Sequence, residues 1–352
     1  MKNVIYGARV MMVVLIGALL CSCSAIEEPQ PELGTIHFGT NATGLTRTLI
    51  NNDNLTANGI AVCVSAVRNG STTLYDKERL YRDATTAKWL PTTNRRQNWA
   101  TGSSYEFNGF AYSTALASSS LTINSGGKQI VVSQPSSYNE DLMVDYLYSH
   151  SFKVSDGRVR PLVQLDLEHA MSLVEIRIVR HPSIGEAYLE EATISGFYRK
   201  ATMSCTTPAL YNSGGTNEWK VEFPADATKQ TTYTRSGLDP TSNPKASCWA
   251  LSDDKSSEEA TILRFTAVPQ QMEADNLLTV TYWVNEKFDE ESEDRLVQHS
   301  ETFNLYDYNP ILWQPGHRIV YTMEIDTGIH LQGVIQPWVD VDYIEGTVLP
   351  DV

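Results

Sequence analysis

The sequence predicts a mainly β fold built from β-sandwiches. In many short segments apolar residues recur at every second position, and these segments are rich in β-branched and aromatic residues. Turn-forming residues separate the segments from one another. Few stretches have an amphipathic helical pattern, and short helices are expected only at 141–150 and 185–191. Many short strands with turns between them favour packed β-sheets over helical or α/β architectures.

The N-terminal segment is typical of an exported lipoprotein. The apolar run Val10–Leu20 is 11 residues long, shorter than the roughly 20 residues that a membrane-spanning helix needs. Leu20-Cys21-Ser22-Cys23 follows, with an aliphatic residue three positions before Cys23 and a small residue directly before it. We therefore expect a signal peptide over 1–22 and lipidation of Cys23, which would anchor the protein to the outer membrane. An ordinary secretory signal with incidental cysteines is the alternative.

A spacer and two domains are expected after the signal. Residues 23–34 are polar and acidic and contain two prolines, as in an extended tether. The polar stretch 151–161 precedes a new run of alternating strands, which suggests a boundary between an N-terminal domain at 35–165 and a C-terminal domain at 166–352.

Composition excludes several classes of function. The formal net charge of −15 argues against nucleic acid as a partner, because that binding depends on Lys and Arg neutralising phosphates. After Cys23 only Cys63, Cys205 and Cys248 remain, so at most one disulfide can form, and which of them pair is open. Their spacing does not suit zinc, and no metal or cofactor is expected.

Five segments have the strand pattern most clearly. In 173–178, for example, Val174 and Ile176 point to one face and Glu175 to the other. The remaining segments are 60–67, 262–268, 278–284 and 319–325. Each is expected to form a strand.

Two hairpins are predicted between strands. The first spans 121–132, where Ser125-Gly126-Gly127 supplies the positive φ angles of a tight turn. The second has the acidic run 289–295 at its tip, between Trp283 and Phe303. A calcium loop is the alternative for this run, but the run lacks the alternating ligands and central glycine of such loops.

No catalytic motif is present, so an enzyme is not expected. The sequence has no nucleophile elbow, metalloprotease motif, phosphate loop or dinucleotide-binding loop. His169 follows a β run and is interpreted as a core or capping histidine rather than a catalytic base. Asp340 and Asp342 share a strand face as glycosidase carboxylates could, but acids are abundant and the pattern has little weight.

Four motifs together resemble one protein family. They are Ile36-His37-Phe38 with Thr46-Arg47-Thr48, Trp99 with YEFNGFAY (105–112), Asp141-Leu142-Met143 with LDLEHAMSLVEI (165–176), and WQPGHRIVY (313–321) with Pro337-Trp338. In order and spacing the chain resembles the fimbrillin-like proteins, the type V pilins of Gram-negative gut and oral anaerobes. The likeness spans nearly the whole chain after the signal.

The resemblance implies two tandem transthyretin-like β-sandwich domains and assembly with other fimbrial subunits. In the family an Arg-specific surface protease trims the N-terminus, and Arg47 is the matching position. Trimming there would release 23–47, including the strand-like segment 35–39, and leave an open apolar groove that a strand of the next subunit could fill. The alternative for Arg47 is an exposed arginine in a polar loop.

The C-terminal segment differs from stalk subunits of the family, in which an extension supplies the donor strand. Here the residues after Trp338 alternate acidic and apolar side chains, and a short donor strand would use Val339, Val341, Tyr343 and Ile344. The same residues could instead form the last strand of the second domain, as in a tip or anchor subunit. The sequence leaves stalk, tip and anchor open.

A surface glycan-binding lipoprotein of a carbohydrate-uptake system is the second hypothesis for function. Its candidate sugar-stacking residues are Trp89, Trp99, Trp219 and Trp249. Aromatic residues are also the largest apolar contributors to a β-sandwich core, so burial is the competing interpretation of each.

Overall fold

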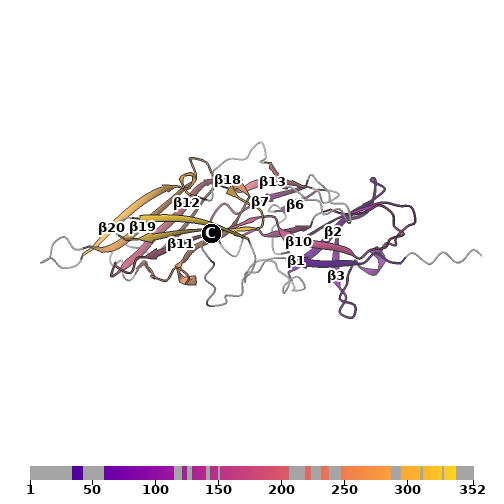
Figure 1. Ribbon diagram of the computed structural model, residues 1–352, viewed down its shortest axis with the longest axis horizontal. Helices are drawn as coiled ribbons and strands as arrows, with labels where there is room; N and C mark the ends of the chain where they lie inside the picture. Colours follow the sequence, from indigo (N-terminus) through magenta and orange to yellow (C-terminus); the bar gives the residue numbers. More distant parts are fainter. Residues whose placement is uncertain are drawn as a thin grey trace, which may run out of the picture.

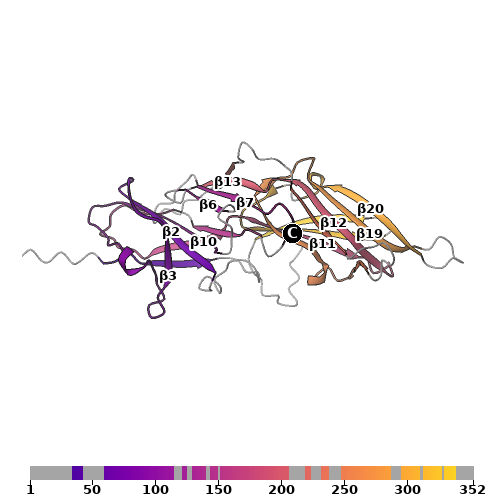
Figure 2. The same ribbon diagram turned by 180° about the vertical axis from the view of Figure 1, so that it is seen from behind.

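The computed structural model describes residues 34–42, 59–114, 121–124, 129–139, 143–149, 151–205, 219–222, 231–237, 247–286, 295–309, 312–326 and 329–337. The molecule is elongated, with β1, β2, β3 and β10 near one end and β11, β12, β19 and β20 near the other (Figures 1 and 2). Its described elements are strands and three-residue 3-10 helices, the latter at Thr93–Arg95, Glu258–Ala260 and Leu305–Asp307. The prediction of a mainly β fold is therefore confirmed.

The first sheet closes on itself into a small barrel. Its strands are β1 (Phe38–Ala42), β2 (Ile60–Arg68), β3 (Thr72–Arg82), β4 (Trp89–Leu90), β5 (Tyr105–Ser113), β8 (Tyr146–Ser149), β9 (Phe152–Val154) and β10 (Val163–His169). They follow the order β2-β3-β4-β1-β10-β8-β5-β9, and a further pairing of β2 with β5 closes the ring. The interior is filled by apolar side chains, among them Ile36, Phe38, Phe107 and Leu165.

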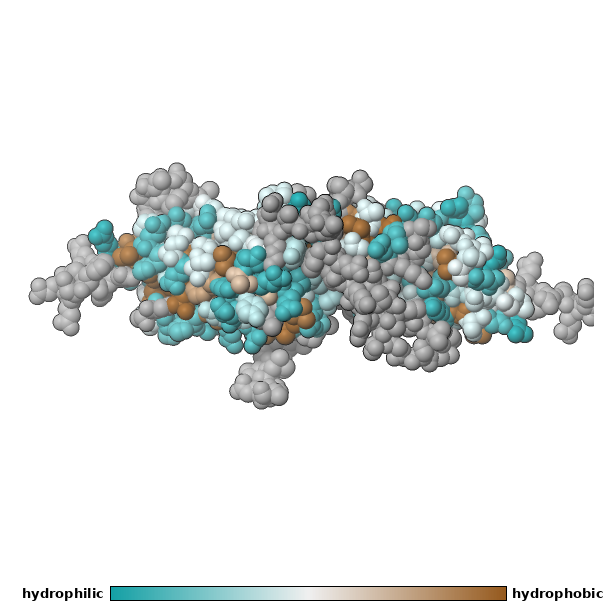
Figure 3. Space-filling view, turned by 90° about the horizontal axis from the view of Figure 1, so that it is seen from above, coloured by the Kyte–Doolittle hydropathy of each residue, from teal (hydrophilic) through white to brown (hydrophobic). Residues whose placement is uncertain are grey.

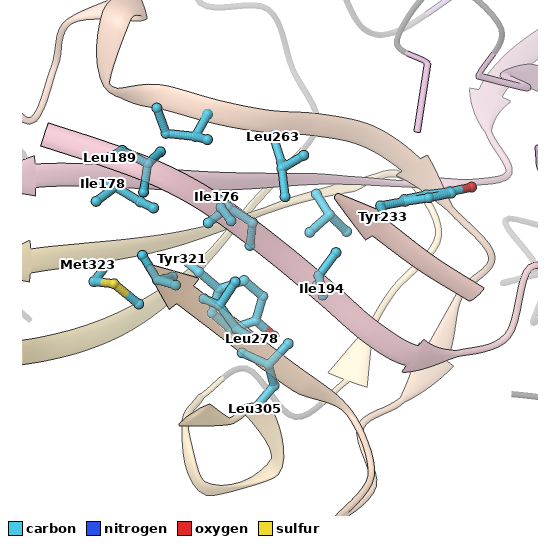
Figure 4. Close-up of a cluster of buried hydrophobic side chains, with 14 of the residues drawn as sticks. Ile176, Ile178, Leu189, Ile194, Tyr233, Leu263, Leu278, Leu305, Tyr321 and Met323 are labelled. Atoms are coloured by element: carbon cyan, nitrogen blue, oxygen red, sulfur yellow. The ribbon is translucent and has the colours of Figure 1, made fainter. Parts of the chain in front are cut away.

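Two further sheets share a second core. One has the order β17-β11-β22-β23, formed by Thr261–Ala267, Ser172–Arg180, His317–Ile325 and Ile329–Pro337. The other has the order β15-β12-β19-β20, formed by Thr231–Ser236, Ala187–Phe197, Leu277–Glu286 and Arg295–Asn304, with β16 (Trp249–Ala250) beside β12. Side chains of both sheets meet in Figure 4, where Ile176 and Tyr321 face Leu189 and Leu278 across the core.

A fourth sheet connects the barrel with the second core. It has the order β14-β13-β7-β6, formed by Trp219–Glu222, Lys200–Cys205, Gln129–Ser133 and Leu121–Ile123. Its buried residues Val132 and Met203 belong to the same apolar cluster as Tyr146 of the barrel and Leu173 of β11. A two-stranded sheet of β18 (Gln270–Gln271) and β21 (Leu312–Trp313) completes the described pairings.

The predicted domain boundary between 165 and 166 lies inside β10, a barrel strand. Because the connecting sheet takes strands from both sides of that boundary, these pairings do not themselves divide the chain, and the division stays a prediction.

The five predicted strands are all present, as β2, β11, β17, β19 and β22. Both hairpins are also confirmed, because β6 pairs antiparallel with β7 and β19 with β20. The turn at 125–128 and the acidic residues 289–294 lie outside the described residues.

The two predicted helices are wrong. Residues 146–149 form β8, whose four side chains are all buried: Leu147 joins the barrel core, while Tyr146 and Tyr148 join the connecting cluster. Burial on both faces removes the polar alternation that identifies a strand. Residues 187–191 begin β12, where a register shift between Leu189 and Glu191 interrupts the alternation.

The face of the molecule seen in Figure 3 carries scattered apolar residues. The hydrophobic residues visible there form separate small spots among hydrophilic ones. No helix within the described ranges is long and apolar enough to cross a membrane. The predicted signal peptide, Cys23 and most of the tether lie outside the described residues.

Candidate functional site

Strand β1 lies between β4 and β10 in the barrel wall. It pairs in parallel with β10 over five positions, from Phe38 opposite Val163 to Ala42 opposite Leu167. On its other side it meets β4 in antiparallel fashion, with Phe38 opposite Trp89. The predicted strand-like segment 35–39 overlaps β1 at Phe38 and Gly39, and Thr35 forms an isolated antiparallel bridge with Asn98.

Two side chains of this segment enter the barrel core. Ile36 and Phe38 are both 0% exposed. The Phe38 ring packs edge-on against Tyr75 and Phe107, with ring centroids 5.9 and 5.8 Å apart. Burial of two such side chains stabilises the barrel by about 3–6 kcal/mol on the usual transfer scale. The segment is thus an integral part of the core.

The backbone just before β1 is bonded to the loop that follows β4. The Ile36 N–H donates to the Gln97 carbonyl at 2.9 Å, and the Trp99 N–H donates to the Gly34 carbonyl at 3.3 Å. Tyr75 supports this loop, because its hydroxyl accepts a hydrogen bond from the Gln97 N–H at 3.1 Å. Burial raises the pKa of Tyr75 to about 12, so this hydroxyl stays protonated at neutral pH.

The outward side of the segment carries His37 and Gly39. The Nδ1 atom of His37 lies 3.3 Å from Nζ of Lys88. Partial burial lowers the pKa of His37, and the nearby charges of Lys88 and Arg96 lower it further. His37 is therefore a neutral acceptor for the lysine. A side chain at position 39 would collide with Oε1 of Gln164, so the Gln164 side chain lies directly over the glycine.

Loss of this segment would change the barrel in a defined way. The cavity vacated by Ile36 and Phe38 would be lined by apolar and aromatic residues, including Tyr75 and Phe107. The backbone groups of β10 that pair with β1 would lose their partners, and such an edge is a template for another strand. Without this segment the barrel would therefore have a groove of apolar side chains beside an unpaired strand edge.

Arg47, the predicted cleavage position, and the candidate donor-strand residues lie outside the residues that the structure describes. Arg47 lies five positions after the end of β1 at Ala42 (47 − 42), in the segment 43–58 outside the described residues. The same holds for the candidate donor residues Val339, Val341, Tyr343 and Ile344, and for Asp340 and Asp342.

His169 is a core histidine, as predicted. It is 3% exposed, and its Nδ1 atom lies 3.1 Å from Oδ1 of Asp145, which is also buried. No group of three metal-ligating side chains occurs in the described part of the chain. Cys63 and Cys248 are free thiols, and burial raises the pKa of Cys63 to about 11, which makes it a poor nucleophile.

Two of the four candidate sugar-stacking tryptophans are buried. Trp89 and Trp99 are 6% and 3% exposed, and both belong to the barrel core. Trp249 is half-buried beneath the guanidinium of Arg235, 5.1 Å from its ring centroid. The side chain of Trp219 lies outside the described residues. The glycan-binding hypothesis therefore gains nothing from Trp89 or Trp99.

A buried charge cluster escaped the sequence analysis. Glu175 is 1% exposed and forms ion pairs with Arg318 at 2.7 Å, Arg264 at 3.0 Å and Arg177 at 3.2 Å. Burial raises the pKa of Glu175, but the hydrogen bond from Arg318 and the charges of the three arginines outweigh it, so the pKa is lower than usual. The cluster ties β17, β11 and β22 together on the face opposite the core.

Comparisons with known proteins found one family and several solved structures. Residues 46–338 match the family described as fimbrillin-like. A crystal structure of a candidate cell adhesion protein from Bacteroides uniformis is 14% identical, covers 87% of this chain and 99% of that chain, and has a TM-score of 0.47. The crystal structure of a candidate cell adhesion protein from Bacteroides ovatus is 12% identical, covers 88% of this chain and 99% of that chain, and has a TM-score of 0.48. A fimbrial assembly protein from Parabacteroides distasonis is 11% identical, covers 86% and 100%, and has a TM-score of 0.37. No curated protein matches the chain.

Proposed function

Since the chain belongs to the fimbrillin-like family, we propose that it is a surface-exposed lipoprotein that serves as a structural or adhesive fimbrial subunit. Cys23 carries the lipid anchor at the outer membrane, and no catalytic step is involved. The partners are other fimbrial subunits and the Arg-specific protease that processes them. As in the family, the two halves of the chain are taken as tandem transthyretin-like domains.

Assembly proceeds by strand addition after cleavage at Arg47. The observation that supports this is the position of β1. Ile36 and Phe38 are buried in the barrel core, and among the described strands β1 pairs with β4 and β10. Its neighbour along the chain, β2, is not its neighbour in the sheet. Cleavage between β1 and β2 would leave β1 held by noncovalent contacts alone. A strand from another subunit can then take its place.

The buried side chains would make cleavage and exchange two separate steps. Ile36 and Phe38 keep the cut segment in the groove until an incoming strand offers equivalent apolar side chains. A trimmed subunit therefore keeps a closed barrel, without an unpaired strand edge, until a strand of another subunit replaces β1.

The test is to treat the full chain with an Arg-specific protease and to look for SDS-resistant ladders on a gel. The account predicts ladders for the native chain and none for Arg47→Ala. Arg95→Ala, which changes an exposed arginine paired with Glu78, is the matched control and should still form ladders. Ladders from Arg47→Ala, or none from the native chain after complete cleavage at Arg47, would refute the proposal.

A further inference from the structure

A small cavity lies at the end of the β3–β4 hairpin, outside the barrel core. Its volume is about 200 Å³. The hairpin is short here, with Tyr81 opposite Leu90 and Arg82 opposite Trp89. The lining residues are Tyr81, Arg82, Asp83, Leu90, Pro91, Thr92, Thr93 and Arg96.

The cavity is positively charged in a chain whose net charge is −15. Arg82 and Arg96 are exposed, and neither forms an ion pair with a carboxylate among the described residues. Asp83 belongs to the same lining; its Oδ1 atom accepts hydrogen bonds from the backbone N–H groups of Thr85 and Thr86 at 2.8 and 2.9 Å, and the charge of Arg96 helps to lower its pKa. Two arginines against one aspartate leave one positive charge in excess in the lining. By contrast, the adjacent Arg95 is paired with Glu78 at 3.1 Å.

The titration of a neighbouring group supports this positive potential. The pKa of His37 is lowered by burial and also by the charges of Lys88 and Arg96. Arg96 thus acts as a cation on the groups around it.

The cavity also has an apolar side. Tyr81 is 49% exposed, an unusual state for a large ring, and the guanidinium of Arg79 lies 5.5 Å from its ring centroid. Leu90 and Pro91 are buried and form an apolar floor. Thr93 is exposed and offers a hydroxyl at the rim. A tyrosine, two arginines and a threonine thus belong to the lining of one small cavity.

We propose that this cavity binds a sugar acid, a pyranose ring that bears a carboxylate. The carboxylate lies between Arg82 and Arg96, whose planar guanidinium groups bind carboxylates in a bidentate manner. The C–H face of the ring packs against Tyr81, and Thr93 bonds a ring hydroxyl. A small apolar cavity with a few convergent polar groups is the general form of a ligand site. This cavity does not depend on trimming at Arg47, so the proposal is independent of subunit assembly. Binding of a sugar acid there would give the subunit an adhesive role.

Binding of glucuronic acid and N-acetylneuraminic acid to the full chain tests this directly by calorimetry. Glucose is the matched neutral sugar, and acetate is the carboxylate without a ring. The proposal predicts saturable binding of at least one sugar acid, with glucose and acetate at least about tenfold weaker, since loss of a charge-assisted pair costs that much affinity.

Variants then locate the site. Arg82→Ala and Arg96→Ala should each weaken the sugar acid at least about tenfold. Tyr81→Ala should weaken binding while Tyr81→Phe retains it, because the ring rather than the hydroxyl is used. Arg95→Ala, next to the cavity but outside its lining, should leave the affinity unchanged. Thermal melting confirms that each variant is folded.

Four results would overturn the proposal. They are no binding of either sugar acid, equal binding of glucose, equal binding of acetate, and an affinity that Arg82→Ala and Arg96→Ala leave unchanged. Tighter binding of an acidic peptide with the sequence of residues 338–348, with displacement of the sugar, would reassign the cavity to a protein partner.

Discussion

Phe38 and Val163 lie opposite each other in the parallel strands β1 and β10, although 125 positions separate them in the sequence (163 − 38). Parallel pairing excludes a direct hairpin between the two strands. β4, on the other side of β1, is likewise not next to it along the chain. β1 is thus joined to its sheet neighbours by backbone hydrogen bonds and side-chain packing. Under the proposed cleavage at Arg47, these noncovalent contacts alone would hold it in the barrel.

Phe38→Ala tests how much the barrel depends on this strand. The side chain is 0% exposed and packs against Tyr75 and Phe107. We expect a loss of about 3–5 kcal/mol in the free energy of unfolding, as for other fully buried phenylalanines. Urea denaturation measures it. Leu312→Ala, at a position that is 43% exposed, is the control and should cost about 0.5 kcal/mol or less. Equal costs for the two variants would show that β1 is not part of the core.

His37 gives β1 a pH dependence whose sign follows from its pKa. In the unfolded chain His37 has its ordinary pKa of 6.5, and in the folded barrel the pKa is lowered. The unfolded state therefore binds more protons as the pH falls, so the barrel loses stability below about pH 6.5 until the folded pKa is passed. Denaturation midpoints between about pH 7 and pH 5 should fall more for the native chain than for His37→Gln. Parallel curves for the two proteins would contradict this assignment.

Glu175→Ala probes the ion cluster on the face of the β17-β11-β22-β23 sheet opposite the second core. It would leave Arg177, Arg264 and Arg318 without their common anion, and breaking a buried pair in this way costs about 3–5 kcal/mol. Asp253→Ala removes a partner of Arg180 that is 47% exposed, and its cost should be about 1 kcal/mol or less. Chemical denaturation measures the free energy of unfolding of both variants. Similar losses for the two would show that Glu175 stabilises the fold no more than an exposed ion pair does.

The lowered pKa of Glu175 makes a separate prediction for acid. Its contribution to stability is fully present above its ordinary pKa of 4.5 and is lost as the pH falls through the folded value. The native chain should therefore lose more stability than Glu175→Gln when the pH is lowered from about 5 to about 2. An unchanged difference between the two proteins over this range would count against the ion pairs.

Local pattern predicted the strands but not their partners. Alternation in 173–178 identified β11, because Val174, Ile176 and Ile178 enter the core as expected. The same pattern placed Glu175 on the outer face but gave no sign of its burial, since Arg318 comes from 143 positions away in the chain. The pairing of β2 with β5, which closes the barrel, is also non-local. Such contacts depend on tertiary packing, which a periodicity does not encode.

For the site, too, the sequence pattern predicted the strand-like segment but not its neighbours in the barrel. Ile36-His37-Phe38 has the apolar-polar-apolar pattern of a strand, and both apolar residues are buried. Its position between β4 and β10 could not be derived from the segment alone. The cavity beside Tyr81 combines residues of β3, β4 and the following loop that have no common motif, so no sequence signal indicated it.

The most direct test is competition by a synthetic peptide with the sequence of β1. It asks whether subunits join through the groove that β1 occupies in the barrel. The full chain is trimmed with the Arg-specific protease in the presence of excess synthetic peptide of residues 34–42, and SDS-resistant ladders are measured. The account predicts that this peptide suppresses the ladders in proportion to its concentration, while the same peptide with Phe38→Ala does not. Ladders of undiminished length at saturating native peptide would show that subunits join elsewhere.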